Sequence, residues 1–411
     1  MHRVLLLIPS ASYRAPDFMN AAARLGVEVA VGSNITHPLG DRSTGLHVGL
    51  DFADVARGTG QIEALADHHP IDSIIAVDDA GVRLAAAASR RLELPHNSVR
   101  SVEATRNKAL LRRRLAEGGV PSPAYRVVRT SDAPRDASAG LEYPVVLKPL
   151  ALAASRGVIR ANDAAEFADA FERIKRILQE PDNARDCGPL AGELLVESFI
   201  PGDEVSLEGI LESGRLTTLA IFDKPDPLDG PFFEETIYLT PPRLPEETQV
   251  LIERTASDAC QALGLGEGPV HAELRINERG AFPIDIAARS IGGLCGRTLT
   301  FGTGLSLEEL IISHAIGEPI VADRVAGAAG VMMIPIPAGG ILRSISGLEG
   351  ARAIPFIESI DVPVRKGSRV IPLPEGGDYL GFIFSSGPDP DTVETALRDA
   401  HSRLAFEIVS D

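Results

Sequence analysis

Two carboxylates on neighbouring predicted strands are the residues of this sequence best placed to do chemistry. Glu273 and Asp285 lie in the stretch 271–286, where apolar and polar residues alternate on both sides of a short turn. This pattern predicts a β-hairpin. Burying unpaired carboxylates is costly, and a divalent cation with oxygen ligands would remove that cost. An ordinary ion pair with Arg275 or Arg289 explains this segment equally well.

Positive charge is scarce in this chain, so each lysine is informative. The sequence has 40 Lys and Arg against 57 Asp and Glu, which gives a net charge of −17. Such a balance argues against a nucleic-acid-binding surface, and a phosphate-rich ligand would need a local concentration of positive charge. Lys148 ends an apolar strand immediately before Pro149, and Lys108 begins a basic amphipathic helix. A lysine flanked by apolar residues is more often a snorkelling side chain than a functional one.

Two further segments have features of a nucleotide site. The small-residue loop 153–158 could let backbone N–H groups approach phosphate oxygens, although surface hairpins have the same composition. The segment 194–209 predicts two strands interrupted by Pro-Gly, against which an adenine ring could lie. Glu204 could then accept hydrogen bonds from ribose hydroxyls. An ordinary hairpin with Glu204 in solvent is the alternative.

The length of 411 residues predicts two to four domains, and the apolar fraction of 44% is that of a globular protein. We expect an N-terminal α/β domain with a parallel sheet over 1–100, because strand and helix patterns alternate there. Asp78 and Asp79 follow one of its strands and are weak candidates for a substrate contact, with helix capping as the preferred interpretation. A central region follows over 101–320, divided at 192/193.

The remaining residues, 321–411, predict a small α+β domain that carries little chemistry. Within the central region we expect a polar connector at 181–188 and a loop at 223–235 that closes over a cleft. The three cysteines are far apart in sequence, and no apolar run reaches transmembrane length. We therefore expect a cytoplasmic protein without a membrane or nucleic-acid partner.

Taken in order, these motifs resemble those of the ATP-grasp ligases. More narrowly, the chain is similar to the carboxylate–amine ligases of the L-amino-acid ligase branch, and the resemblance covers nearly the whole chain. It implies an ATP-grasp fold with a preceding α/β domain, two ATP-clamping subdomains and a C-terminal domain. It also implies ATP with Mg²⁺ or Mn²⁺, amide formation through an acyl phosphate, small carboxylate and amine substrates such as amino acids, and a homodimer.

The resemblance assigns a role to each nucleotide residue. Lys108 and Lys148 match the lysines that hold the phosphates, and Ser155, Arg156 and Gly157 match the phosphate loop. Glu197 matches the residue that contacts the adenine amino group, Phe199 and Ile200 match the hinge that reads the ring, and Glu204 matches the ribose carboxylate.

The reacting groups follow from the same resemblance. Glu273 and Asp285 match the magnesium ligands, and Arg289, with Lys148, matches the catalytic cations that steady the acyl phosphate. Asp285 is one methylene shorter than the commoner Glu, and Ala287 stands where many members have Asn. Whether one or two metal ions bind therefore remains open. Residues expected to lie near the substrates are Lys224, His271, Ser290, Gly292 and Gly293.

Two other functions remain open on the sequence. One is a different ATP-grasp enzyme, of the carboxylase or purine-biosynthesis type, for which a basic patch that binds a substrate phosphate would be expected. The other is an ATP-binding regulatory homologue without turnover, which the residues at 285 and 287 keep open.

Overall fold

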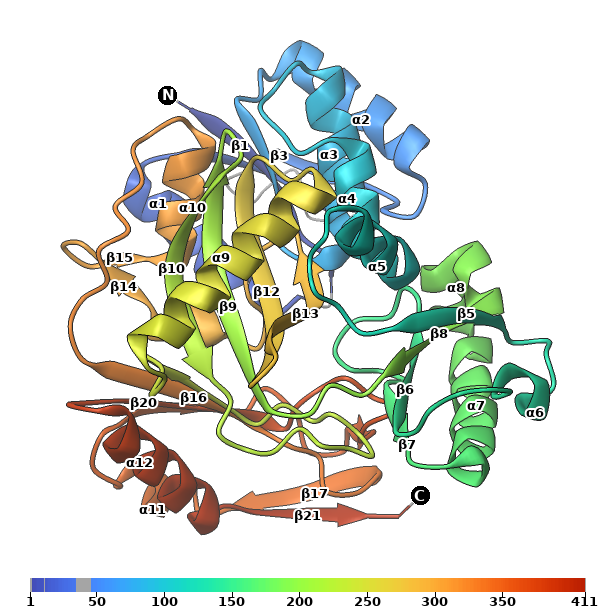
Figure 1. The fold of residues 1–411 in the computed structure, drawn as a ribbon. Helices are drawn as coiled ribbons and strands as arrows, with labels where there is room; N and C mark the ends of the chain where they lie inside the picture. The colour runs from blue at the N-terminus through green and yellow to red at the C-terminus, as the bar shows by residue number, and fades with distance from the viewer. Residues whose placement is uncertain (1, 11, 35–45, 411) are drawn as a thin grey trace.

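The computed structural model describes residues 2–10, 12–34 and 46–410 (Figure 1). The N-terminal part holds a parallel sheet in the order β3-β2-β1-β4. Its strands are β1 (Arg3–Leu7), β2 (Glu28–Ser33), β3 (Leu46–Gly49) and β4 (Ser73–Ala76). The helices are α1 (Ala15–Leu25), α2 (Val55–His68) and α3 (Val82–Arg91). The predicted open parallel α/β architecture is confirmed.

Two short helices, α4 (Val99–Arg106) and α5 (Lys108–Glu117), lead to the central region. Asn107 separates them, because its extended backbone ends α4 while its side chain accepts hydrogen bonds from the first N–H groups of α5. Lys108 therefore sits at the first turn of a helix, as predicted.

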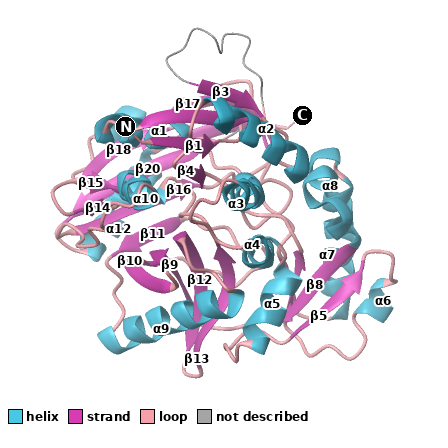
Figure 2. Ribbon diagram, turned by 90° about the horizontal axis from the view of Figure 1, so that it is seen from above, coloured by secondary structure: helices cyan, strands magenta, loops and turns pink. Residues whose placement is uncertain are grey.

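A second sheet has the order β5-β8-β6-β7 and lies at one side of the molecule (Figure 2). Its strands are β5 (Tyr125–Arg129), β6 (Val145–Pro149), β7 (Ile159–Ala161) and β8 (Glu193–Ser198), and α6 (Pro134–Ala137) lies between β5 and β6. Helix α7 (Ala164–Gln179) buries Phe167, Phe171 and Ile174 against this sheet. These residues recur at helical spacing, so one face of α7 is apolar.

The predicted polar connector at 181–188 is wrong. Residues Pro181–Cys187 form helix α8. Proline at the first position has the φ that a helix needs, and Gly188 ends the helix with a positive φ of 52°. Polar composition therefore indicated solvent exposure rather than a loop.

The largest sheet joins the central and C-terminal parts of the chain. Its order is β13-β12-β9-β10-β11-β16-β20-β18, and its neighbours are antiparallel. The strands are β9 (Asp203–Glu212), β10 (Arg215–Asp223), β11 (Ile237–Thr240), β12 (Gly268–Asn277), β13 (Gly280–Ala287), β16 (Ala328–Ile334), β18 (Ile357–Asp361) and β20 (Gly381–Gly387). Helix α9 (Glu246–Leu263) covers β9, β10 and β13, and α12 (Pro390–Arg403) covers β16 and β20. The sheet thus runs across the boundary that we predicted at 320/321.

Smaller elements complete the C-terminal part. Strands β17 (Gly340–Ser346), β19 (Arg369–Val370) and β21 (Ala405–Val409) form a sheet beneath the large one, and α11 (Leu348–Arg352) packs on α12. Helix α10 (Leu307–Ala315) packs on α1 and ties this region to the N-terminal sheet. In the part of the chain that the structure describes, no helix is long and apolar enough to span a membrane.

The predicted hairpin is confirmed as β12 and β13. Glu273 and Asp285 are direct partners across the two strands, so their side chains lie on the same face. A register shift follows immediately, because Leu274 pairs with Pro283 and leaves Ile284 as an extra residue. The hairpin therefore places both carboxylates together at one end of the sheet.

Candidate active site

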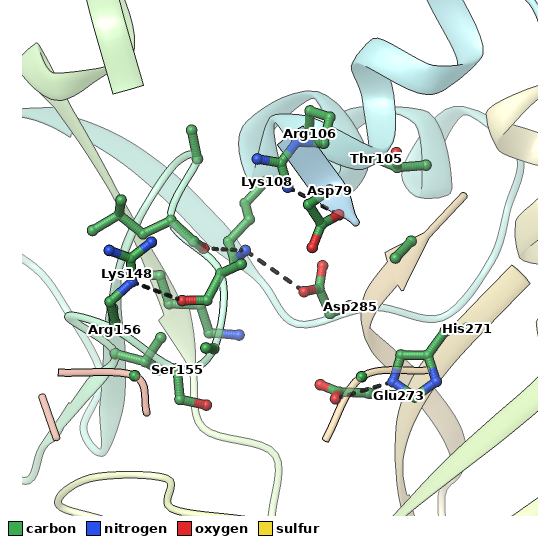
Figure 3. Close-up of a pocket in the computed structure, with 18 of the residues that line it drawn as sticks. Asp79, Thr105, Arg106, Lys108, Lys148, Ser155, Arg156, His271, Glu273 and Asp285 are labelled. Atoms are coloured by element: carbon green, nitrogen blue, oxygen red, sulfur yellow. Dashed lines mark hydrogen bonds and ion pairs between the residues drawn. The ribbon is translucent and has the colours of Figure 1, made fainter. Parts of the chain in front are cut away.

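A cavity of about 670 Å³ lies where the N-terminal sheet, the β5–β8 sheet and the β12–β13 hairpin meet. This volume is within the range of small-molecule sites. Figure 3 shows Asp79 and Arg106 on the N-terminal side, with Ser155 and Arg156 across the open space from His271 and Glu273. The predicted residues that line it are Lys108, Lys148, Ser155, Arg156, Glu197, Phe199, Ile200, Glu204, His271, Glu273, Asp285, Arg289, Gly292 and Gly293.

Three predicted residues lie behind the wall of this cavity. Gly157 donates its backbone N–H to the carbonyl oxygen of Pro374, at 2.9 Å. Lys224 is buried among carboxylates, and Ser290 is buried with its hydroxyl oxygen accepting a hydrogen bond from Arg14, at 2.6 Å. These contacts favour a role in supporting the cavity wall rather than direct contact with a ligand.

Glu197 is held between two cations. Its carboxylate pairs with Arg112 and, at 2.8 Å, with Lys148. Burial alone would raise the pKa of Glu197, but these two cations lower it to about 2. The guanidinium of Arg112 also donates to the carbonyl oxygens of Pro283 and Ile284, at 3.0 and 2.7 Å. This cluster fixes β8 and β13 relative to α5, and it fills acceptor positions of Glu197 that the expected adenine contact would use.

Lys108 reaches into the cavity from the first turn of α5. Its ammonium lies 3.6 Å from the carboxylate of Asp285 and donates to the carbonyl oxygen of Leu152, at 3.2 Å (Figure 3). The side chain of Asp285 is 39% exposed, so its remaining oxygen positions face the cavity. Lys108 and Lys148 thus both present positive charge there.

The loop between β6 and β7 turns through residues with left-handed backbone. Ala154, Ser155 and Gly157 have φ values of 55°, 53° and 69°, in the left-handed region. The backbone N–H groups of Arg156, Gly157 and Val158 donate to the carbonyl oxygens of Ala153, Pro374 and Ser155, at 3.4, 2.9 and 3.1 Å, so side chains are the groups that this loop offers to an anion. The guanidinium of Arg156 is fixed by the amide oxygen of Asn183, at 2.8 Å.

Among the described residues, a carboxylate cluster surrounds Lys224. Oxygens of Glu204, Glu235 and Glu273 lie within 4.8 Å of one another. The ammonium of Lys224 is 2.8 Å from Glu204 and 3.4 Å from Glu273, and it also pairs with Glu235. Glu204 in addition accepts from Arg275, at 3.1 Å. The predicted ribose carboxylate is therefore already paired on both oxygens.

The two acids at the centre of this cluster have opposite pKa shifts. Burial and the charge of Glu273 raise the pKa of Glu235 to about 7, although Lys224 lowers it. Burial also acts to raise the pKa of Glu273, but Lys224 and His271 hold it well below its usual value. The donors are all carboxylate oxygens on a cavity wall, which is the chemistry that Mg²⁺ or Mn²⁺ requires. The residues present therefore fit the expected cation.

His271 lies between two acids. Its ring nitrogens are 3.4 Å from Glu208 and 3.4 Å from Glu273. Burial lowers the pKa of His271, but the two carboxylates raise it above its ordinary value. The same oxygen of Glu208, Oε2, also accepts a hydrogen bond from the N–H of Ile291, at 3.0 Å. His271 thus connects a cavity carboxylate to a fully buried one.

Arg289 points back toward the N-terminal sheet. Its guanidinium is 2.9 Å from the carboxylate of Asp79, which also pairs with Arg106 at 3.0 Å. Burial opposes the charge on Arg289, but Asp79 keeps the pKa of the guanidinium above its usual value. The preferred interpretation of the Asp78-Asp79 pair as helix caps is wrong, because Asp78 makes no side-chain cap and Asp79 forms these ion pairs. Asp79 lies at the carboxyl end of β4, where ligands bind in such sheets.

Some residues of this site were not singled out from the sequence. Arg112 follows Lys108 by four positions in a helix, so the two share a face and could have been paired. Glu235 gave no such signal, because its partners lie on strands that only the tertiary structure brings together. Arg275 was considered as an ion-pair partner of the hairpin carboxylates, whereas it pairs with Glu204.

Three family models match the chain: an ATP-grasp N-terminal domain at residues 19–96, an ATP-grasp domain at 141–298, and an L-amino acid ligase C-terminal domain at 332–409. The structure is similar to that of an L-amino acid ligase from Bacillus licheniformis, with a TM-score of 0.84 at 25% identity over 100% of this chain and 99% of that one. The chain therefore belongs to the ATP-grasp superfamily, and its C-terminal domain is of the L-amino acid ligase type. The predicted fold class is confirmed.

Curated relatives agree with this placement. Dapdiamide A synthase of Enterobacter agglomerans is 32% identical over 57% of this chain, and alanine–anticapsin ligase of Bacillus subtilis is 29% identical over 61%. Each alignment spans 55% of the relative, so the chain matches about half the length of these two enzymes. The uncharacterized protein y4rH of Sinorhizobium fredii is 26% identical over 99% of this chain and 84% of its own length.

Proposed function

We propose that this protein is an ATP-dependent carboxylate–amine ligase that joins amino acids or similar small molecules. The observation that carries the proposal is the charge pattern of the cavity. Three cations from separate segments, Lys108, Lys148 and Arg289, line the same 670 Å³ space as the carboxylates Glu273 and Asp285. In a chain of net charge −17, positive charge gathered at one cavity favours a phosphate-rich ligand.

The proposed reaction has two steps. An oxygen of the substrate carboxylate bonds to the γ-phosphorus of ATP, and the bond from that phosphorus to the ADP oxygen breaks. The amine nitrogen of the second substrate then bonds to the acyl carbon of the resulting acyl phosphate. Phosphate leaves with the C–O bonding electrons, and the nitrogen loses a proton, which yields an amide, ADP and phosphate.

Each side chain has a defined part in this scheme. Little covalent work falls to the protein in phosphoryl transfer, so positioning and charge stabilisation dominate. Lys108 and Lys148 would bind the phosphates, and Arg289 would stabilise negative charge on the acyl phosphate and the tetrahedral intermediate. Glu273 and Asp285, with Glu235 beside Glu273, would hold the divalent cation, which neutralises phosphate charge when bound.

The loop 224–236 would exclude water from the acyl phosphate. It is anchored to the β5–β8 sheet by Arg160 of β7. The guanidinium of Arg160 donates to the carbonyl oxygen of Asp229, at 2.7 Å, and its backbone N–H donates to that of Pro231, at 2.9 Å. Phe233 and Glu235 of this loop line the cavity. Exclusion of water protects a hydrolysable intermediate.

The proposal is tested by Mg²⁺-dependent ADP release over pools of amino acids and small carboxylic acids. Glu273→Ala should abolish the release, whereas Glu278→Ala, in the exposed turn of the same hairpin, should leave it unchanged. A pool that stimulates the wild-type protein and not Glu273→Ala supports the ligase, and separating that pool identifies the substrates. ATP binding without turnover in any pool would favour the regulatory homologue, and absence of ATP binding would refute the nucleotide site.

A further inference from the structure

The C-terminal domain, expected to carry little chemistry, reaches the predicted phosphate loop. Residues 371–379 connect β19 to β20 and cross from the C-terminal sheets to the β5–β8 sheet. We call this segment the strap and residues 153–158 the phosphate loop. Gly377 and Tyr379 of the strap line the same cavity as Lys108 and Lys148.

Three contacts join the strap to the phosphate loop and to α7. Glu375 accepts two hydrogen bonds from the guanidinium of Arg173 on α7, at 2.6 and 2.9 Å. The carbonyl oxygen of Pro374 accepts from the N–H of Gly157, at 2.9 Å. Gly377 packs so closely that an added Cβ would lie 3.0 Å from Cγ of Arg156 and 3.1 Å from Cβ of Ala154.

These contacts constrain the phosphate loop where its backbone is least regular. Gly157 has a φ of 69°, and its N–H is held by the strap rather than by the neighbouring strand. A loop that must order itself around a ligand loses conformational entropy on binding, and prior fixation lowers that cost. The Arg173–Glu375 pair is bidentate, so it fixes the orientation of the strap relative to α7 as well as the distance between them.

We propose that the strap is a working part of the nucleotide site and holds the phosphate loop in its binding conformation through Pro374, Glu375 and Gly377. This inference rests on the proposed function, because it requires that the cavity bind ATP. Glu375 and Arg173 touch no ligand in this scheme and act as positioning residues. The strap would therefore couple the C-terminal domain to the phosphates of the nucleotide.

The test measures binding of Mg²⁺ADP, Mg²⁺ with a non-hydrolysable ATP analogue, and AMP by calorimetry on the full chain. Glu375→Arg should weaken ADP and analogue binding by roughly three- to tenfold, as expected for loss of one well-oriented ion pair and repulsion of Arg173. AMP binding should not change, because AMP lacks the phosphates that the loop would hold. Arg173→Glu combined with Glu375→Arg should restore most of the lost affinity.

Asp378→Arg is the matched control. Asp378 is exposed on the same strap, so this change adds the same charge without breaking the pair. Gly377→Val should weaken ADP binding without any change of charge, because its side chain must displace Ala154 or Arg156.

Each outcome decides between the two proposals. Wild-type protein that binds no adenine nucleotide overturns both the proposed function and the strap. Wild-type protein that binds ADP, with equal affinity in Glu375→Arg and Asp378→Arg, overturns the strap and leaves the proposed function intact. Equal weakening of AMP and ADP binding by Glu375→Arg would show a general disturbance of the fold and would also overturn it.

Discussion

Replacing Glu197 by Gln should destabilise the β5–β8 sheet by about 3 kcal/mol at pH 7. The change leaves Arg112, which is 1% exposed, and Lys148 as two neighbouring buried cations without a compensating carboxylate. Breaking a buried ion pair by removing one partner typically costs about 3–5 kcal/mol. The lowered pKa of Glu197 gives a free energy of similar size, because a fall from 4.5 to about 2 corresponds to about 3.4 kcal/mol at 1.36 kcal/mol for each pKa unit.

The pH dependence of this effect has a definite sign. The folded-state pKa of Glu197 is depressed, so its contribution is fully present above 4.5 and is lost as the pH falls toward about 2. The difference between the wild-type protein and Glu197→Gln should therefore shrink by roughly 1.4 kcal/mol between pH 7 and pH 3.5.

Hydrogen exchange followed by mass spectrometry measures the opening free energy of peptides from β6 and β8 at both pH values. The matched control is Glu193→Gln, which makes the same substitution at the exposed start of β8 and should stay within about 0.5 kcal/mol of the wild-type protein. A loss below about 1 kcal/mol for Glu197→Gln at pH 7, or a difference that does not narrow at pH 3.5, would refute the role assigned to this cluster.

Three further predictions concern other parts of the site. Asp79→Asn should reduce turnover by roughly 10²-fold while nucleotide affinity stays constant, because Arg289 loses the carboxylate that orients it. Asp78→Asn, on the same cavity wall, should have a much smaller effect on turnover, and an equal loss of turnover in both variants would contradict this reasoning. Ser290→Ala should lower the free energy of unfolding by about 1.5–3 kcal/mol with unchanged KM values, since its hydroxyl serves the buried Arg14; a raised KM without loss of stability would instead restore Ser290 as a substrate contact. All three cysteines are buried with raised pKa values, so iodoacetamide at pH 8 should modify them slowly in the native protein and rapidly in urea, and rapid native labelling would show that a thiol is accessible.

Local patterns were sufficient to predict much of the fold. The alternation of apolar residues around Glu273 and Asp285 fixed both the hairpin and the face that these side chains share, because a strand repeats every two residues. The alternation of strand and helix patterns over 1–100 likewise indicated the parallel sheet, and glycine is a usual end of such helices, as at Gly26 after α1, where φ is 66°. Helix α8 was missed because its polar surface resembles a connector.

The charge pairing of the site could not be predicted in the same way. Glu197 and Glu204 were expected to face the nucleotide, yet each is paired with two cations from other segments. Arg112 and Arg275 reach them only after strands separated by many residues have paired. The sequence was thus sufficient to select candidate residues, whereas their ion-pair partners could not be predicted without the order of the strands in the sheet.

The order of the large sheet also limits how this chain can be assembled and shortened. Strand β11 lies between β10 and β16, and β16 lies beyond the predicted boundary at residue 320. A nascent chain cannot complete this sheet until β16 and β20 have left the ribosome. A protein cut at residue 320 would end with β11 as an exposed edge, where unpaired N–H and C=O groups invite pairing with other chains. We therefore expect the ATP-grasp part, expressed without the C-terminal domain, to aggregate.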